Sequence, residues 1–346
     1  MAQMNPREEI VGFMRGFFAC PLITALGKRG VFSRFLDGPF TADDFPQIVD
    51  RQLFRYVLTY LESIGLLEQS DEGSNTYTPT ELGAKVFKRY GSFVLLHSYR
   101  DLIEHMDALL FEEGAKQPAC DRLDNVIGSG LTNGRKFFPK AIEMMNSLDV
   151  RVIGDIACGD GDFLGRVIQE FPGVSVVASD LSEVAITETV KNLGSKYPET
   201  AVATVQTDAL DVDAWARTIA ERHESLGGDV VVSMWYLVHE ISRHDADLVA
   251  DFFCRIHEVC PDAHLVVGEI VNLPIEVLKN NRHGSIMPEF LLFHDVSGQG
   301  VLTWDQFQYL LTKIPYSLEH EAKFDLVETQ QGEMPTGLVW HLKPRD

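Results

Sequence analysis

The chain has 346 residues, 45% of them hydrophobic, which is enough for two domains with cores of their own. Its net charge of −21 at pH 7 opposes binding to nucleic-acid phosphates and to anionic membranes. The five cysteines include no C-x-x-C pair, so we expect reduced thiols in a cytoplasmic protein. We expect neither a signal peptide nor a segment of transmembrane length.

Residues 1–90 predict helices followed by a polar hairpin. Apolar residues recur at helical spacing over 7–37, and Thr41 is typical of a helix N-cap. The strongest helical pattern covers 52–67, and the polar stretch 68–78 then predicts two short strands. This order of elements predicts a winged-helix domain.

A winged helix serves either to bind DNA or to hold two copies of a chain together. The would-be recognition helix offers only Arg51 and Arg55, whereas the hairpin carries Glu68, Asp71 and Glu72. These acids would face phosphates, so we expect no nucleic-acid partner. We expect a homodimerisation domain instead.

We expect residues 91–148 to form a helical linker and a lid over the acceptor (substrate) pocket. Helical patterns cover 93–110 and 137–148, and a polar turn is expected at 128–130 between them. Two arginines of the linker, Arg122 and Arg135, are candidates for holding an anionic substrate.

Residues 149–346 alternate between β-like and helical patterns, which predicts an α/β Rossmann-like domain with a mostly parallel sheet. The expected strands cover residues 152–156, 174–180, 201–206, 229–234 and 263–269, with a closing hairpin of 326–329 and 337–342. Ligands bind at the carboxyl ends of such strands.

The first of these strands leads into a turn of small residues. The turn reads Asp155-x-Ala157-x-Gly159-x-Gly161 and a helical pattern follows it. Glycines allow a close approach of the backbone to a ligand, and the acidic residue suits a cationic ligand better than a pyrophosphate.

Acids also follow the next two strands, at Asp180 and Asp208. Together with the glycine turn they resemble the class I S-adenosylmethionine (SAM) methyltransferases, although Ala157 stands where that motif usually has its first glycine. The resemblance implies that SAM is the cofactor. It implies a cofactor site made of Asp155, Gly159, Gly161, Asp180, Leu181, Asp208, Ala209 and Ser233.

The segment after the fourth strand, W-Y-L-V-H-E-I-S, resembles the catalytic-base segment of small-molecule O-methyltransferases with an N-terminal winged helix. His239 matches the histidine base, Glu240 stands for the usual Asp, and Ile241 replaces the usual Trp. Glu269 matches the acid that orients the histidine. Tyr236 is expected to line the acceptor pocket.

A second histidine, His294, follows an apolar run in the segment that usually covers the acceptor. His239 and His294 could together hold iron or another first-row divalent metal ion with open positions. This arrangement resembles the α-keto-acid C-methyltransferases of peptide natural-product biosynthesis. The resemblance implies methylation next to the keto group of phenylpyruvate, 2-ketoarginine or a branched 2-oxo acid through a metal-bound enolate.

Two alternatives stay open. One is metal-free O-methylation of a hydroxyl with His239 as general base. The other is a SAM-binding winged-helix regulator. Further metal ligands or supporting residues are possible at His244, His283, Glu240 and Asp295.

Overall fold

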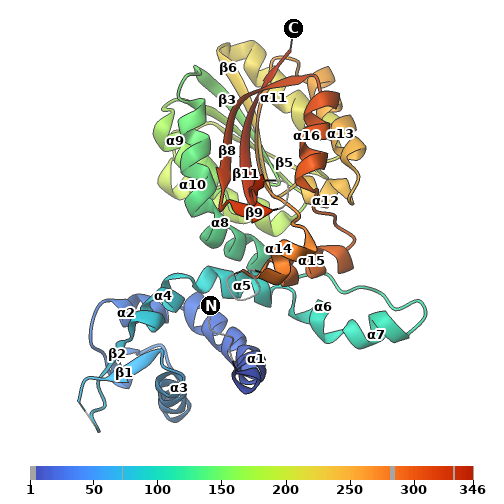
Figure 1. Cartoon of the computed structure of the whole chain (residues 1–346). Coiled ribbons are helices and arrows are strands. Elements are labelled where there is room, and N and C mark those ends of the chain that lie inside the picture. The colour runs from blue at the N-terminus through green and yellow to red at the C-terminus, as the bar shows by residue number, and fades with distance from the viewer. Residues whose placement is uncertain (1–4, 72, 281–284, 330–331, 346) are drawn as a thin grey trace. The chain divides into compact units, whose positions relative to one another are not determined.

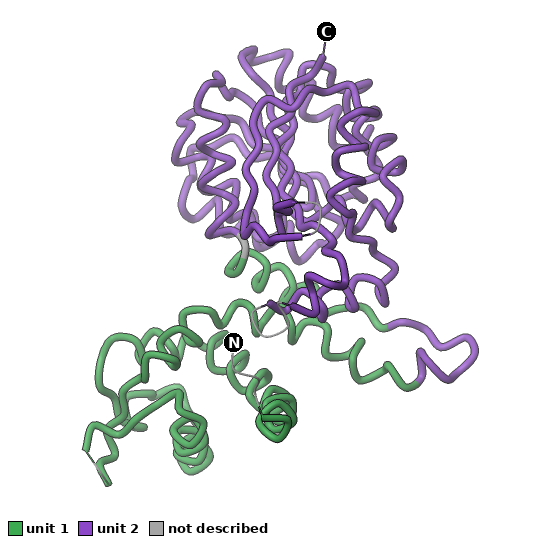
Figure 2. The backbone as a smooth tube through the Cα atoms, in the orientation of Figure 1, with its two compact units in different colours: residues 1–107, 118–132 green, residues 108–117, 133–346 purple. Residues whose placement is uncertain are grey.

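The computed structural model describes residues 5–71, 73–280, 285–329 and 332–345 (Figure 1). The chain forms two compact units (Figure 2). Unit 1 comprises residues 1–107 and 118–132, and unit 2 comprises residues 108–117 and 133–346. The expected linker, residues 91–148, is therefore divided between the two units.

Unit 1 consists of helices around one small antiparallel sheet, the wing. Its elements are α1 (Pro6–Lys28), α2 (Val31–Leu36), η1 (Ala42–Asp44), α3 (Arg51–Ser63), β1 (Leu67–Gln69), β2 (Tyr77–Pro79), α4 (Glu81–Lys88), α5 (Tyr90–His97), α6 (Arg100–Glu104) and α7 (Met106–Phe111), of which the last runs into unit 2. Its core is rich in phenylalanines, of which Phe35 and Phe40 stack with their ring centroids 4.2 Å apart. The predicted N-cap Thr41 forms a capping box with Asp44.

α1 is a long and unexpectedly apolar helix. By length and composition it could cross a membrane, with a mean hydropathy of 1.6 over its most apolar window, of which 28% is buried. The expectation that no segment reaches transmembrane length was therefore wrong for α1. Its exposed side chains include Phe13 (78% exposed) and Phe17 (77%).

The turn predicted at residues 128–130 is wrong, because these residues lie inside the 24-residue helix α8 (Arg122–Met145). The glycine at position 128 allows α8 to pack closely against α5. A Cβ atom on Gly128 would lie 2.4 Å from the backbone nitrogen of Leu95 in α5. α8 begins in unit 1 and ends in unit 2.

Unit 2 contains a seven-stranded sheet in the order β5-β4-β3-β6-β7-β11-β8. The first five of these strands are parallel, and β11 is antiparallel to both of its neighbours. The strands are β3 (Val150–Ile156), β4 (Ser175–Asp180), β5 (Val202–Gln206), β6 (Asp229–Trp235), β7 (His264–Ile270), β8 (Tyr316–Phe324) and β11 (Gly337–Pro344).

Helices cover both faces of this sheet (Figure 1). One face packs against the C-terminal half of α8 and against α9 (Asp162–Glu170) and α10 (Glu183–Lys196). The other face packs against α11 (Val212–Leu226), α12 (Val238–Ser242), α13 (Ala246–Val259) and α16 (Trp304–Lys313). The remaining elements are α14 (Ile275–Asn280), α15 (Met287–Val296), β9 (Val327–Thr329) and β10 (Gly332–Met334).

The predicted pairing of residues 326–329 with residues 337–342 is wrong in its first strand. β9 pairs with β10 in a separate two-stranded sheet, and the strand beside β11 is β8. β8 has the polar and charged pattern of an edge strand, with residues 318–321 exposed. Its weak apolar alternation explains why the sequence did not reveal it.

Candidate active site

The glycine loop joins β3 to α9 and has a strained backbone. Ala157, Gly159 and Gly161 all have positive φ angles, of 59°, 59° and 77°. An alanine in this conformation costs roughly 1–2 kcal/mol, which explains why glycine is the usual residue there. The loop places backbone N–H groups at the N-terminus of α9.

Asp155, at the end of β3, is 1% exposed. Its Oδ1 accepts a hydrogen bond from the hydroxyl of Ser233 at 2.6 Å, and its Oδ2 has no partner among the described residues. Burial raises the pKa of Asp155 to about 7; the Ser233 bond opposes this rise and the charge of Asp180 adds to it. Ser233, which is fully buried, therefore positions the carboxylate.

The other predicted cofactor residues lie at the ends of the neighbouring strands. Asp180 Oδ2 accepts a hydrogen bond from the N–H of Gly159 at 3.1 Å. Leu181 is 62% exposed. Asp208 is exposed beyond β5, and the carbonyl of Ala209 accepts a bond from Trp215. Because β5, β4 and β3 are adjacent and parallel, these residues share one sheet edge.

His239 lies on α12, just beyond β6, and is 4% exposed. Its Nδ1–H donates to Glu269 Oε1 at 2.9 Å, and its backbone N–H donates to Oε2 at 3.1 Å. Burial lowers the pKa of His239, but the charge and hydrogen bond of Glu269 outweigh burial, so the pKa is raised. The bond from Nδ1 places the lone pair of the neutral ring on Nε2.

His294 lies on α15 and is 1% exposed. Its Nδ1–H donates to the carbonyl of Phe290 at 2.6 Å, which again assigns the lone pair to Nε2. Burial, together with the charge of nearby His239, lowers the pKa of His294 to about 3. The ring is therefore neutral at physiological pH.

The structure brings the two histidines together. Their ring centroids lie 4.6 Å apart, and the rings are perpendicular at 89°. Phe290 stacks on His294 with the centroids 3.9 Å apart. Phe290 was not among the predicted site residues, although its position one helical turn before His294 could have indicated it.

The other proposed ligands that the structure describes are exposed. Glu240 is exposed on α12. His244 and Asp295 bond to each other at 2.9 Å, and both side chains are about half exposed. His283 lies outside the described residues. Within the described ranges, no group of three or more His, Cys, Asp or Glu residues could hold a metal ion.

The two candidate arginines are both exposed on α8, Arg122 in unit 1 and Arg135 in unit 2. The structure does not favour one of them for a substrate carboxylate. Tyr236, the third predicted substrate residue, packs against the apolar cluster that includes Phe290.

Comparisons with known proteins agree with this architecture. Residues 15–113 match the AprA winged helix domain family. No curated protein sequence matches the chain. The human N-acetylserotonin methyltransferase, solved with SAM, is 15% identical over 100% of both chains, with a TM-score of 0.62.

Two further solved structures are similar over nearly the whole chain. A mitomycin 7-O-methyltransferase is 15% identical over 98% of this chain and 97% of that chain (TM-score 0.59). A putative O-methyltransferase from Nostoc punctiforme is 13% identical over 98% and 100% (TM-score 0.63). The chain has the winged-helix methyltransferase fold. The predicted fold class is thereby confirmed.

In this methyltransferase fold, a loop after α15 ties the two histidines together. The N–H of Gln299 donates to the carbonyl of His294, and the N–H of Gly300 donates to that of His239, both at 2.8 Å. The hydroxyl of Ser242 donates to the Gly300 carbonyl. A Cβ atom on Gly300 would lie 2.0 Å from the nitrogen of His244, so only glycine fits.

Gly300→Ala should therefore displace His239 relative to His294. We expect a loss of about 1–3 kcal/mol in the free energy of unfolding from overpacking, and at least a tenfold loss of any activity that depends on the histidine pair. Gly298→Ala is the matched control, because a Cβ atom there meets nothing within 4 Å. Its left-handed backbone should cost about 1 kcal/mol, with activity nearly unchanged. Equal activity losses in both variants would contradict the role of Gly300.

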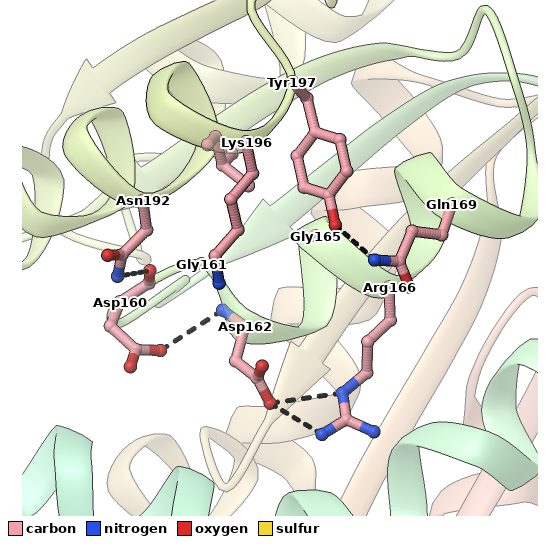
Figure 3. Close-up of a pocket in the computed structure, with 10 residues that line it drawn as sticks. Asp160, Gly161, Asp162, Gly165, Arg166, Gln169, Asn192, Lys196 and Tyr197 are labelled. Atoms are coloured by element: carbon pink, nitrogen blue, oxygen red, sulfur yellow. Dashed lines mark hydrogen bonds and ion pairs between the residues drawn. The ribbon is translucent and has the colours of Figure 1, made fainter.

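A separate hollow of about 350 Å³ lies between α9 and α10 (Figure 3). Asp162 pairs with Arg166 there, and Gln169 donates to the hydroxyl of Tyr197. Among the predicted site residues, its lining includes Gly161. Neither histidine of the pair lines it.

Proposed function

We propose that the chain is a SAM-dependent methyltransferase that methylates the carbon next to the keto group of a 2-oxo acid, with a divalent metal held by His239 and His294. The observation that carries the proposal is the pair of buried imidazoles 4.6 Å apart. His239 lies just beyond β6, which is the direct neighbour of the strand that leads into the glycine loop, and His294 is contributed by α15.

SAM binding is proposed from the residues at the sheet edge around the glycine loop. SAM carries a sulfonium and an ammonium group, and the unpartnered Oδ2 of Asp155 offers a negative charge in a water-excluded place. Asp180, held beside the loop by Gly159, can accept hydrogen bonds from the ribose hydroxyls. The N-acetylserotonin methyltransferase of the same fold was solved with SAM.

The raised pKa of Asp155 predicts pH-dependent SAM binding. Below a pH of about 7 the carboxyl group is protonated, and above it the group is ionised and attracts the cationic cofactor. We expect the affinity for SAM to rise about tenfold from pH 6 to pH 8, measured by calorimetry. Asp155→Asn should bind SAM weakly with no such rise. An equal rise in that variant would assign the pH dependence to another group.

The histidine pair fits a first-row divalent metal. With a pKa of about 3, His294 keeps its Nε2 lone pair at any physiological pH. Glu269 holds the other nitrogen of His239, as carboxylates do behind metal-ligating histidines. A bound metal would act as a Lewis acid toward the keto and carboxylate oxygens and would lower the pKa of the adjacent C–H.

Two protein ligands leave positions for a chelating substrate. A 2-oxo acid has two suitably spaced oxygens, and phenylpyruvate, 2-ketoarginine and branched 2-oxo acids are the acceptors we propose. Their β-methylated products would supply amino acids for peptide natural products. Of the two arginines predicted for the substrate carboxylate, Arg135 belongs to the same compact unit as the histidine pair.

Metal-free O-methylation is the second candidate, and the His239–Glu269 pair favours it. Glu269 orients a buried imidazole whose Nε2 could accept a proton from a hydroxyl group. Of the three named structural neighbours, one is a mitomycin 7-O-methyltransferase and another is described as a putative O-methyltransferase. This mechanism assigns no role to His294, which lies against the proposed base.

One experiment separates the two chemistries. The purified protein is analysed for metal by mass spectrometry, and methyl transfer to phenylpyruvate and to a panel of phenols is measured with and without a chelator. Near-stoichiometric metal and chelator-sensitive transfer to phenylpyruvate support the proposal. Metal-free protein that methylates phenols regardless of chelator would show O-methylation.

We also propose a homodimer formed through unit 1. Several apolar side chains of α1 are exposed, among them Ile10, Phe13, Met14, Phe17 and Phe18. A second copy of the chain would bury these side chains, whereas the net charge of −21 disfavours an anionic membrane.

Light scattering tests the dimer. We expect twice the chain mass for the wild type and a monomer for the double variant Phe13→Asp, Phe17→Asp, because buried aspartates oppose association. Val49→Asp is the control, since Val49 is 97% exposed outside α1. A monomeric wild type, or flotation with neutral vesicles, would contradict the dimer.

The winged-helix regulator has less support. Of the two cations in α3, Arg51 already donates to the carbonyl of Ala42 at 2.6 Å. The wing strand β1 carries Glu68. A gel-shift assay with random duplex DNA would reveal this activity.

A further inference from the structure

The hydroxyl group of Tyr236 is buried without a hydrogen-bond partner among the described residues. An unsatisfied buried hydroxyl costs free energy that a phenylalanine at the same place would avoid. The ring itself packs well, so packing alone does not explain a tyrosine here. The hydroxyl can therefore donate a hydrogen bond to a bound molecule.

Tyr236 is also held in a strained conformation. Its φ angle is +55°, which is rare for a bulky residue, and its N–H donates to the carbonyl of Gly268 at 2.9 Å. Strain of this kind persists where the surrounding structure imposes it, often at functional sites. Here it occurs one residue beyond β6 and three residues before His239.

Tyr236 shares an apolar cluster with a neighbour of the histidine pair. On one side its ring stacks on Phe137, with the centroids 5.6 Å apart and an interplanar angle of 22°. It also packs in one apolar cluster with Phe290 and Leu291 of α15. Phe290 is the residue that stacks on His294.

The charge of its surroundings keeps Tyr236 a donor. Burial raises the pKa of its hydroxyl well above the usual value, and the negative charge of Glu269 raises it further. The hydroxyl therefore stays protonated throughout the physiological range. A neutral O–H group seeks an acceptor oxygen with a lone pair.

We propose that the Tyr236 hydroxyl donates a hydrogen bond to a carbonyl or carboxylate oxygen of the acceptor bound at His239 and His294, and so selects acceptors that carry such an oxygen. This inference rests on the proposed function for the identity of the acceptor. It assigns Tyr236 a role in acceptor specificity beyond lining a pocket. SAM binding does not depend on it.

Tyr236→Phe tests the proposal, because we expect this variant to keep or gain stability while it binds the acceptor more weakly. Without ligand, the Tm should stay equal or rise, since an unsatisfied hydroxyl is removed. The KM for phenylpyruvate, or its Kd with S-adenosylhomocysteine present, should rise about tenfold, the effect of one lost hydrogen bond. The Kd for SAM should not change.

Tyr316→Phe is the matched control. Its hydroxyl is likewise buried without a partner among the described residues, but it lies on β8 in the apolar cluster on the α13 and α16 side of the sheet. This variant should keep its stability and bind the acceptor like the wild type. A tenfold loss shared by both variants would overturn a specific role for Tyr236.

The remaining outcomes are also decisive. A lower Tm for Tyr236→Phe would reveal a structural partner of the hydroxyl, and an unchanged KM would exclude the hydrogen bond; either result overturns the proposal. If the wild type methylates only phenols, the 2-oxo-acid function fails and this choice of acceptor oxygen fails with it. A wild type that uses phenylpyruvate while Tyr236→Phe is unaffected overturns the Tyr236 inference alone.

Discussion

Replacing His294 with alanine should lower methyl transfer to a 2-oxo acid by about 100-fold or more. The imidazole lies perpendicular to His239 with ring centroids 4.6 Å apart, and its low pKa keeps it a neutral ligand. Its removal leaves one histidine of the pair, so the metal content should fall with the activity. Mass spectrometry of the purified variant and a methyl-transfer assay measure both effects.

His244→Ala is the control for this variant. His244 is the nearby exposed histidine that bonds to Asp295, and its loss should leave metal content and activity close to those of the wild type. SAM affinity should be unchanged in both variants. An active, metal-free His294→Ala protein would exclude the two-histidine site and favour metal-free transfer with His239 as the base.

Glu269→Gln should damage both stability and activity. The carboxylate accepts three N–H groups, from the His239 ring, the His239 backbone and the Ile270 backbone. Glutamine has one acceptor oxygen and an NH₂ group that would face one of these donors. We expect a loss of about 3 kcal/mol or more in the free energy of unfolding, and a 10–100-fold loss of activity.

The pH profile of Glu269→Gln tests the role of the ion pair directly. Glu269 raises the pKa of His239, so the wild-type ring keeps its extra proton to higher pH than a free histidine. Only the neutral ring can bind a metal or act as a base, so activity should rise with pH through that pKa. In the variant this rise should move to lower pH.

Glu240→Gln is the matched control. Glu240 is exposed on the same helix and adds a smaller upward contribution to the pKa of His239. Its variant should unfold like the wild type and shift the profile only slightly. An unshifted profile in Glu269→Gln would show that the activity does not depend on the protonation of His239.

Local sequence patterns were sufficient for much of the architecture. The parallel strands β3, β4, β6 and β7 are mostly apolar, and an acid or a glycine turn lies at or just after the ends of β3, β4, β5 and β7. In a parallel sheet such ends meet at one edge. The glycine loop, Asp180 and Glu269 could therefore be placed by counting strands. The winged helix was predictable because its helices have clear apolar faces and capping residues.

Predictions failed where a contact between distant segments decides the structure. Gly128 looks like a turn residue, but it is helical because α5 packs closely on α8. β8 has the polar pattern of an edge strand, and only its register with β11 defines it. Local propensity contains no information about either partner.

The sequence by itself determined the order of the elements, the acidic and glycine residues of the cofactor edge, and the two histidines as candidates. The tertiary structure alone decided that the histidines meet, that Gln299 and Gly300 of one loop hold them, and that the Tyr236 hydroxyl has no partner among the described residues. The physical reason is that the spacing of apolar residues shows only which face of a single helix or strand is buried. Contacts between loops depend on backbone geometry, which the packing of the whole unit sets.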